Sequence, residues 1–374
     1  MPKVERTEES GFISPQKMQI KTNDIHIVMF DAAFPLPVVG GKEKQAFILF
    51  NQLRNIGVSA KVLSYSFADH NEDSDVYRVP KGSIIRIVYF LFKMRKTANI
   101  LHVHTPSRIG IITCIIGKFF LYKTMFKFPN EGLFSETSSK IFFKIFLEYI
   151  VDEIIILEKG TEKELSKFSK LRSKLNLFNN GVHIAKQKSY IDSKNLKLLF
   201  IGRLVGQKGC IYLTEIAKEL KKLNINFQLD IYGRGEEENI LKSIITEQSL
   251  NNEVHLKGET SSSIEIMYNY DIVLLPSMKE GMSNVILEAM SIGLPVISTK
   301  VGALEIQLGD YYQIYGCDLN DITNGFVEKI SLFSQNNKLL EEYGHYLHER
   351  CKNEFSIESI TSKYLCKYQD MNSR

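Results

Sequence analysis

The chain lacks the features that mark secreted, disulfide-stabilised or membrane-spanning proteins. Its five cysteines are far apart in 374 residues and show neither paired spacing nor a metal-ligand pattern, which favours a reducing cytosol. Residues 1–23 are polar and charged, without the apolar segment of a secretory signal, and we expect a flexible tail there. Apolar runs are too short for a transmembrane helix, since Lys118 interrupts the run IGIITCIIGKFF.

Common nucleotide and metal motifs are also missing. There is no Walker sequence, and the turn from Gly233 to Gly235 lacks the third glycine of a dinucleotide-binding motif. Asp73 and Asp75 resemble a metal-binding acidic pair, but they lie in the hydrophilic segment HNEDSD, where a solvated loop is the simpler interpretation. The sequence therefore predicts no metal site and no cofactor.

Acidic residues are absent from one long stretch. Residues 76–130 contain ten basic residues and no acid. Up to Tyr190 the chain has 28 Lys and Arg against 18 Asp and Glu, whereas the remainder has 19 against 25. The two halves therefore differ in the sign of their charge. A basic surface favours acidic ligands or anionic membranes, and nucleic acid is not expected because no reading motif accompanies it.

The first half alternates apolar strands with helices of 3.6-residue periodicity. Such alternation predicts a parallel sheet covered on both faces. We expect strands at residues 25–30, 60–65, 100–103, 122–126, 154–157 and 175–178, and helices at 43–55, 84–94, 109–119, 138–149 and 162–168.

After a polar linker at residues 186–197, the second half repeats this pattern. We expect strands at 198–201, 227–232, 255–256, 272–275 and 296–298, helices ending at Leu220 and Ile245, a helix at 284–291, and two or three terminal helices. The fold class is therefore α/β, with two doubly wound Rossmann-like domains facing a cleft. We assign residues 24–188 to the first domain, 189–355 to the second, and 356–374 to a final helix that can return to the first domain.

The stretch DIVLLPSMKEGMSNVILE, residues 271–288, carries the strongest site signal. A buried strand leads through a loop into a helix, whose free N–H groups attract anions. Glu280 lies in the loop and Glu288 lies inside the helix, so both acids frame the helix start. Because a phosphate beside two carboxylates would be repelled, these acids suit sugar hydroxyls attached to the phosphate. The alternative is that both are solvated surface acids.

Two cations and a glycine pair follow other strands. Arg203 and Lys208 come after the strand 198–201, where a guanidinium and an ammonium can neutralise a diphosphate. Gly40 and Gly41 follow the first strand and leave backbone N–H groups open to a ligand. The alternatives are solvated loop cations and an ordinary turn.

The second half resembles the donor-binding domain of glycosyltransferase family 4, or glycosyl transferases group 1, within the GT-B superfamily. The resemblance rests on GRLVGQKG, YGRGEEE, HLKGE and EGMSNVILEAMSIGLPVISTKVGALEI, and it covers the whole second domain. The first half matches in layout only, through Gly40 and Gly41 and through residues 180–182. The resemblance implies a nucleotide-sugar donor in the second domain and an acceptor in the first.

The resemblance also implies roles for individual residues. Arg203 and Lys208 would hold the donor diphosphate, with Gly41 adding a backbone N–H, while Glu288 would hold the ribose hydroxyls and Glu280 the donor sugar. The residues Gly281, Met282, Ser283, Asn284 and Val285 would line the sugar and phosphate. Members of the family retain anomeric configuration and need no metal, so Glu280, Arg203 and Lys208 are the candidate catalytic residues.

One departure from the family concerns the acceptor side. Many members have a histidine after the strand that is here 122–126, whereas this chain reads FKFPNEG, with Lys127 or Asn130 in that neighbourhood. Glu131 is a candidate acid or base. His102 and His104 end the preceding strand and face one side, where they can line the cleft, pack at the strand end or bind a metal. His104, Lys127 and Glu131 are the candidate acceptor-side residues.

The segment KGSIIRIVYFLFKMRK, residues 81–96, suggests a membrane partner. One face carries an apolar stripe and another carries basic residues, which is typical of a helix at an anionic membrane surface. The alternative is a basic-faced helix of the first domain. The stripe is Ile84, Ile85, Val88, Leu91 and Phe92, and the other face carries Arg86, Lys93 and Lys96 with Tyr89 between them.

Together these features predict a retaining, metal-independent glycosyltransferase of the cytoplasm, attached peripherally to the inner face of the membrane. It would move a hexose-type sugar from a nucleotide-diphosphate sugar, with UDP favoured over GDP, to a hydroxyl of a lipid-linked saccharide. The setting would be bacterial surface polysaccharide assembly. The alternatives are a sugar-nucleotide epimerase, a sugar phosphorylase and a catalytically inactive nucleotide-sugar-binding relative.

Overall fold

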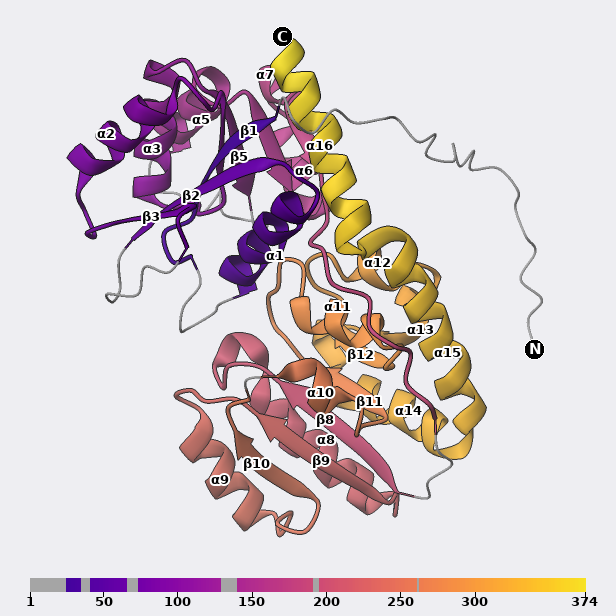
Figure 1. Ribbon diagram of the computed structural model, residues 1–374. Helices are drawn as coiled ribbons and strands as arrows, with labels where there is room; N and C mark the ends of the chain where they lie inside the picture. The colour runs from indigo at the N-terminus through magenta and orange to yellow at the C-terminus, as the bar shows by residue number, and fades with distance from the viewer. Residues whose placement is uncertain (1–24, 35–40, 66–72, 129–139, 191–194, 261) are drawn as a thin grey trace.

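Two parallel α/β domains make up the protein, as the sequence predicted (Figure 1). The computed structural model describes residues 25–34, 41–65, 73–128, 140–190, 195–260 and 262–374. The first domain has a seven-stranded sheet and the second a six-stranded sheet, and each described strand pairing is parallel.

The first sheet has the strand order β3-β2-β1-β4-β5-β6-β7. Its central strands are almost continuous apolar runs, which is the pattern of parallel strands buried on both faces. The strands are β1 (His26–Phe30), β2 (Ser59–Tyr65), β3 (Val76–Val79), β4 (Ile100–Val103), β5 (Lys123–Phe128), β6 (Glu153–Ile156) and β7 (Leu175–Leu177).

Helices cover both faces of this sheet, and each face has its own core. One core combines strand residues such as Val28 and Phe126 with α2, α3 and α5, and the other combines Ile27 and Met125 with α1 and the C-terminal helix α16. The helices of the domain are α1 (Gly41–Asn55), α2 (Ile84–Met94), α3 (Arg108–Phe119), α5 (Lys140–Tyr149), α6 (Lys159–Leu165) and α7 (Ser169–Arg172).

The second sheet has the order β10-β9-β8-β11-β12-β13 and a single large core. Its strands are β8 (Leu196–Ile201), β9 (Phe227–Tyr232), β10 (Val254–Gly258), β11 (Ile272–Leu275), β12 (Val296–Thr299) and β13 (Gly316–Cys317). Its helices are α8 (Cys210–Lys222), α9 (Glu238–Glu247), α10 (Ser263–Met267), α11 (Asn284–Ser291), α12 (Leu304–Leu308), α13 (Tyr312–Tyr315), α14 (Ile322–Gln335) and α15 (Asn337–Arg350).

The last helix, α16 (Ile357–Ser373), leaves the second domain and packs along the first (Figure 1). A single turn of π-helix, Cys351–Phe355, separates it from α15. Tyr364 and Tyr368 enter the core formed with α1. Lys367 and Arg374 lie 3.4 and 2.9 Å from the carboxylate of Glu153, which is 1% exposed. The two domains are therefore joined a second time through buried apolar and ionic contacts.

Both sheets change winding direction at their centres, between β1 and β4 and between β8 and β11. At such a point the loops that leave the two neighbouring strands turn to opposite faces and open a crevice at the carboxyl ends of the strands. The loops after β4, β8 and β11 carry His104, Arg203 and Glu280. The topology alone therefore brings these predicted residues to the facing edges of the two sheets.

The structure also differs from the expected elements in detail. The strand β3 was not expected, and the helix predicted at 162–168 is α6, which ends at Leu165 before the short α7. β5 extends to Phe128, so Lys127 lies inside a strand and not after it. β8 begins at Leu196, within the segment expected to be linker. The domain boundaries at 24–188, 189–355 and 356–374 stay a prediction.

Candidate functional site

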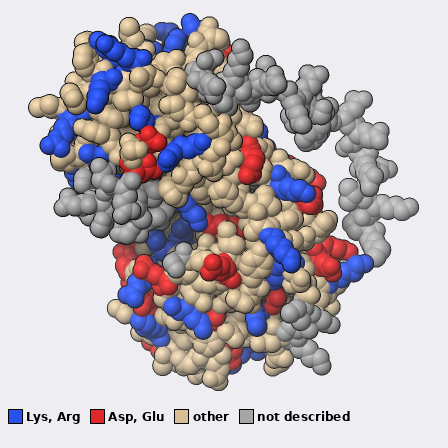
Figure 2. All heavy atoms as spheres, in the orientation of Figure 1, with Lys and Arg blue, Asp and Glu red and all other residues tan. Residues whose placement is uncertain are grey.

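A cavity of about 510 Å³ lies between the two domains. In the space-filling view, basic side chains are set back in the hollow between the two lobes (Figure 2). The residues that line the cavity are Gly41, Gln45, His104, Lys127, Leu157, Asn180, Gly202, Arg203, Gln207, Lys208, Glu280, Gly281, Met282, Ser283, Asn284 and Val285. Eleven predicted site residues therefore share one cavity: Gly41, His104, Lys127, Arg203, Lys208, Glu280, Gly281, Met282, Ser283, Asn284 and Val285.

The floor of the cavity is the loop from β11 to α11. The loop is held from below, since Thr299 donates its hydroxyl to the carbonyl of Ser277 and Gln307 Nε2 donates to the carbonyl of Ser283 at 2.8 Å. Ser283 is the N-cap of α11, but its side chain makes no capping bond with the helix. The first N–H groups of α11 are therefore available to an anion, and the helix dipole favours negative charge there.

Two glycines from neighbouring segments, Gly209 and Gly302, pack so closely against the backbone of this loop that no side chain fits. Gly209, at φ +64°, lies so close that an added Cβ would be 2.0 Å from the carbonyl oxygen of Pro276. Gly302, at φ +59°, would place a Cβ 2.2 Å from the carbonyl oxygen of Gly281. Any other residue would push the loop out of place or strain the backbone.

Lys208 and Glu280 form an ion pair inside the cavity. Their side chains are 19% and 15% exposed, and Ser277 donates its hydroxyl to Glu280 Oε1 at 3.0 Å. Arg203 is exposed and forms no ion pair with any residue that the structure describes. The site thus offers the guanidinium of Arg203 without an ion-pair partner among the described residues. It also offers the ammonium of Lys208, which can exchange Glu280 for a more highly charged anion.

Glu288 lies one turn inside α11 and is 5% exposed. Its Oε1 accepts from Lys44 of α1, and its Oε2 accepts from Ser263 of α10 at 2.6 Å. It does not line the 510 Å³ cavity, which ends short of it. Glu288 is therefore a buried acceptor of hydrogen bonds that connects the two domains through a lysine.

A second polar connection crosses between the domains at Asn284. Its Nδ2 donates to the carbonyl of Gly41 at 2.7 Å, and its Oδ1 accepts from Gln45 at 3.0 Å and from Asn180 at 3.2 Å. Gln45 also forms two hydrogen bonds of 2.9 Å with the backbone of Gly181. These bonds hold the start of α1 against the start of α11, so any ligand in the cavity contacts both domains.

Behind the cavity, the first domain buries a polar cluster around Lys127. Lys127 Nζ donates to Asn180 Oδ1 at 3.0 Å, and burial lowers the pKa of Lys127 to about 8. Asp31 accepts from Thr105 at 3.2 Å, and burial raises its pKa from 3.8 to about 6. Burial also lowers the pKa of His104, so this ring is neutral at pH 7. The cluster can therefore store or release a proton close to neutral pH.

Several atoms of this cluster have no hydrogen-bond partner among the described residues. They are Asp31 Oδ2 and both ring nitrogens of His104. Buried polar atoms are normally paired, so these atoms call for water or a polar ligand. His104 and Lys127 both line the cavity and can meet such a ligand.

His102 lies on the same side as His104, with ring centroids 3.9 Å apart, as the strand alternation predicted. It does not line the cavity, because its Nδ1 bonds to Tyr368 of α16 at 2.7 Å and it is fully buried. Burial lowers its pKa as well. Of the open alternatives, packing at the strand end fits His102, and lining the cavity fits His104.

Two predicted residues, Gly40 and Glu131, lie outside the described residues. Asp73 and Asp75 form ion pairs with Arg54, at 2.6 and 3.5 Å, which supports the interpretation as a surface loop. In the described part of the chain, no three His, Cys, Asp or Glu side chains come together as a metal site, and no helix is long and apolar enough to cross a bilayer.

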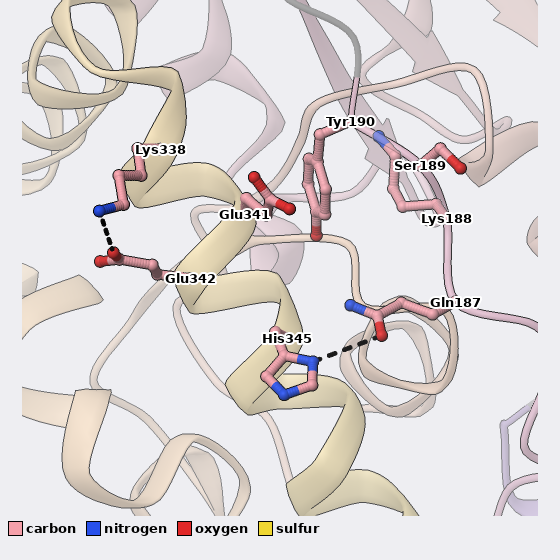
Figure 3. A pocket seen from close by; sticks show the side chains of 8 residues that line it. All are labelled: Gln187, Lys188, Ser189, Tyr190, Lys338, Glu341, Glu342 and His345. Carbon is pink, nitrogen blue, oxygen red and sulfur yellow. Dashed lines mark hydrogen bonds and ion pairs between the residues drawn. The ribbon is translucent and has the colours of Figure 1, made fainter.

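A larger hollow, of about 700 Å³, lies between the linker and α15, away from the predicted site residues (Figure 3). Two pairs of its side chains interact: Lys338 pairs with Glu342 at 3.5 Å, and His345 Nδ1 lies 3.5 Å from Gln187 Oε1. We therefore place the functional site in the smaller cavity, where uncommitted charges and a helix start converge.

Sequence comparison decides the family. Residues 182–350 match the model of the family described as glycosyl transferases group 1. Residues 182–350 are therefore a domain of the glycosyl transferases group 1 family. The matched segment contains Arg203, Lys208, Glu280 and Glu288, and the predicted resemblance to this family is confirmed.

Other members and structures agree with this assignment. An uncharacterized glycosyltransferase of Methanocaldococcus jannaschii is 31% identical over 54% of this chain and 56% of its own length. The Escherichia coli UDP-Gal:alpha-D-GlcNAc-diphosphoundecaprenol alpha-1,3-galactosyltransferase is 28% identical over 53% of this chain and 54% of its own length. The alignments thus span about half the length of these curated relatives.

The structure of Anabaena HepE in complex with UDP-glucose, 14% identical, has a TM-score of 0.76 over 92% of this chain and 99% of that chain. It shows that the group 1 domain here is part of a GT-B fold.

Some residues of the site were not predicted from sequence. Gln45, Lys44 and Asp31 belong to the first domain, where the family motifs are weak. Lys44 and Gln45 follow Gly41 within one turn of α1, so a search of the helix that starts at the glycine pair would have found them. Asp31 ends the first strand at a carboxyl edge, which was also a usable signal.

Proposed function

We propose that this protein is a retaining, metal-independent glycosyltransferase that transfers a hexose-type sugar from a nucleotide-diphosphate sugar to a hydroxyl. One observation carries the proposal: Arg203, Lys208, Glu280 and the N-terminus of α11 converge in one cavity between two domains. Two cations and a helix start suit a diphosphate leaving group, and a carboxylate beside them suits sugar hydroxyls.

In the proposed reaction, the donor diphosphate takes Lys208 away from Glu280 and meets Arg203 and the free N–H groups of α11. Glu280 then accepts hydrogen bonds from the donor sugar. Glu288 accepts from the ribose hydroxyls once Lys44 releases it. The backbone N–H of Gly41 adds a donor from the first domain as the leaving group gains charge.

For the donor and acceptor, we propose a UDP-sugar ahead of a GDP-sugar and a lipid-linked saccharide in bacterial surface polysaccharide assembly. The complex of HepE with UDP-glucose and the UDP-galactose donor of the E. coli relative support the choice of base. The diphosphoundecaprenol acceptor in the name of that relative supports a lipid-linked acceptor.

On the acceptor side, Lys127 lies in the neighbourhood where many family members have a histidine, and His104 follows the adjacent strand β4. Both reach the cavity, and Asp31 lies in the same buried cluster. These residues favour an active enzyme over an inactive relative, since a cluster that titrates near neutral pH is a common feature of catalytic sites.

Thermal unfolding with UDP, GDP, ADP and their hexose conjugates tests the donor site. A ligand at about a hundred times its dissociation constant adds about 2.7 kcal/mol to the free energy of unfolding, a shift of a few degrees. We expect UDP or UDP-hexose to stabilise the wild type but neither Arg203→Ala nor Glu288→Ala. The matched controls Arg172→Ala and Glu247→Ala, both exposed and distant, should keep the shift.

The reaction itself is tested by following the bound sugar nucleotide. Release of nucleoside diphosphate only with a hydroxyl acceptor supports transfer. A changed sugar nucleotide without acceptor would indicate an epimerase, and dependence on orthophosphate would indicate a phosphorylase. Binding without any turnover, across lipid-linked and free saccharide acceptors, would contradict the proposed activity.

A further inference from the structure

Three helices of the first domain leave a broad apolar face uncovered. α2, α3 and α5 all pack on the same side of the first sheet, where Ile87, Cys114 and Phe146 enter one core (Figure 1). Leu91 enters this core too, so the predicted stripe on α2 is partly wrong: its outward part is Ile84, Ile85 and Phe92.

Among the described residues, the four most exposed large apolar side chains belong to this region. They are Leu121, Ile85, Phe119 and Ile141, at 86%, 82%, 80% and 78% exposure. Single exposed apolar residues are normal, but a cluster from three neighbouring helices marks an interaction surface. Further exposed members of this apolar face are Ile84, Tyr89, Phe92, Ile115, Phe142, Ile145 and Tyr149.

Leu121 gives a second indication that this face is used. It follows α3 with a φ of +67°, a left-handed backbone conformation that is strained for leucine and that glycine or asparagine adopts more easily. The side chain buries almost nothing in return, because it is 86% exposed. Fold stability therefore does not account for a leucine at this position.

The charges on α2 and α3 have one sign. α2 and α3 lie within the stretch of residues 76–130, which contains ten basic residues and no acid. Arg86, Lys93, Lys96 and Arg108 are exposed, and blue side chains lie over the region of α2 and α3 at the upper left of Figure 2. Arg95 covers the ring of Phe92 with its guanidinium 4.2 Å from the centroid, so apolar and basic groups are interleaved.

On α5, the acid Glu148 lies 3.6 Å from Lys144, so its negative charge is balanced by that lysine. α3 begins four residues after His104, whereas Phe119 and Leu121 lie at its opposite end.

We propose that α2, α3 and α5 dock on an anionic lipid bilayer, with the apolar side chains entering the interface and the basic residues contacting lipid phosphates. The positive charge of α2 and α3, which carry no acid, favours an anionic lipid over a second copy of this chain, whose identical face would repel it. The inference goes beyond the proposed reaction and can fail separately, because docking needs no donor or acceptor.

Flotation of the full chain with vesicles tests the inference. We expect binding to vesicles of phosphatidylcholine with 30% phosphatidylglycerol, about tenfold or more weaker binding to pure phosphatidylcholine, and release of most protein by 0.5 M NaCl. Equal binding to both lipids, or none at low salt, would overturn the proposal. A nucleotide shift that persists in the same preparation shows that the donor site is intact.

Two sets of variants localise the contact. Lys93→Glu with Lys96→Glu should weaken binding by about thirtyfold or more, whereas Lys218→Glu with Lys363→Glu changes net charge equally on other surfaces and should not. Ile85→Ser, Phe119→Ser and Leu121→Asn should together abolish flotation, unlike Leu223→Ser and Ile240→Ser on the second domain. If the apolar variants alter only the oligomeric state in sedimentation, the face binds a second copy and the proposal is wrong.

The Leu121→Asn variant separates folding from docking. Asparagine accepts a positive φ, so its melting temperature should equal or exceed that of the wild type while its binding to anionic vesicles falls. Unchanged vesicle binding by this variant, with unchanged melting, would show that Leu121 is outside the contact and would remove one argument for the docking face.

Discussion

Lys44 of the first domain forms an ion pair with Glu288 of the second. The pair occupies one carboxylate oxygen of Glu288, and Ser263 occupies the other. Lys208 and Glu280 form an equivalent pair on the other side of the α11 N-terminus. Both acids that are proposed to hold the donor are thus paired with lysines, and ligand binding exchanges these partners for sugar hydroxyls.

Lys44→Met should tighten nucleotide binding by up to about fivefold. The lysine is 39% exposed and the Glu288 side chain 6% exposed, so the ion pair competes with the ribose hydroxyls for a buried carboxylate, and removing the lysine frees that carboxylate for the nucleotide. Titration calorimetry with the nucleotide that stabilises the wild type measures the change. Weaker binding would show that Lys44 contacts the nucleotide directly, and Glu43→Gln, one position away, is the matched control.

Lys208→Met should lower kcat by about 10²- to 10³-fold, the usual loss when one group that stabilises a leaving group is removed. The folded state should persist, because Lys208 ends a single 3-10 turn, Gly206–Lys208, and is not part of a core. Steady-state release of nucleoside diphosphate measures the effect. A variant with normal kcat would exclude Lys208 from stabilising the diphosphate, and Lys218→Met on α8 should behave like the wild type.

Asp31→Asn should stabilise the protein at pH 8 and lose this advantage in acid. Burial raises the pKa of Asp31 to about 6, so between about pH 4 and pH 6 the folded state binds more protons than the unfolded state. This group therefore makes the protein less stable as pH rises through that window, by about 1–3 kcal/mol in total. The amide keeps the Oδ1 acceptor for Thr105 and Ala33.

Chemical unfolding of wild type and variant at pH 4, 6 and 8 measures this difference. His102 and His104 have lowered pKa values, so they destabilise the wild type as pH falls below about 6.5, but they contribute equally to both proteins. A stability difference that does not change with pH would contradict the raised pKa of Asp31.

Gly209→Ala should destabilise the protein by about 1–3 kcal/mol or more and abolish the nucleotide-induced shift. An alanine Cβ would strike the carbonyl of Pro276 and displace the loop that carries Glu280. Gly82→Ala is the matched control, because Gly82 also has a positive φ, of +84°, but has open space around it. If both variants lower the free energy of unfolding equally, the close contact with Pro276 does not contribute to the loss of stability.

The sequence predicted the fold because hydrophobic periodicity and strand-end loops repeat through both halves. It missed β3, which has only four residues, two of which are polar or exposed, so no apolar run marks it. It also placed Leu91 on the outer stripe of α2. The assignment of helix faces depends on which residues the neighbouring strands cover, and that information is tertiary.

The proximity of candidate site residues could be predicted where local motifs fix the backbone. Glu280 and Asn284 belong to one continuous strand-loop-helix unit, so their proximity follows from chain order. Lys44 and Gln45 reach the same place only because the two domains face each other across α11. Contacts of this kind depend on the relative position of two domains, which no local pattern encodes.

The return of α16 to the first domain also constrains the order of folding. Five of its side chains complete the core beneath α1: Ile360, Tyr364, Leu365, Tyr368 and Met371. During synthesis the strands of the first domain leave the ribosome hundreds of residues before these side chains exist. The core of the second domain itself extends to Phe355, so the half of the protein that is made first cannot mature before nearly the whole chain has been made.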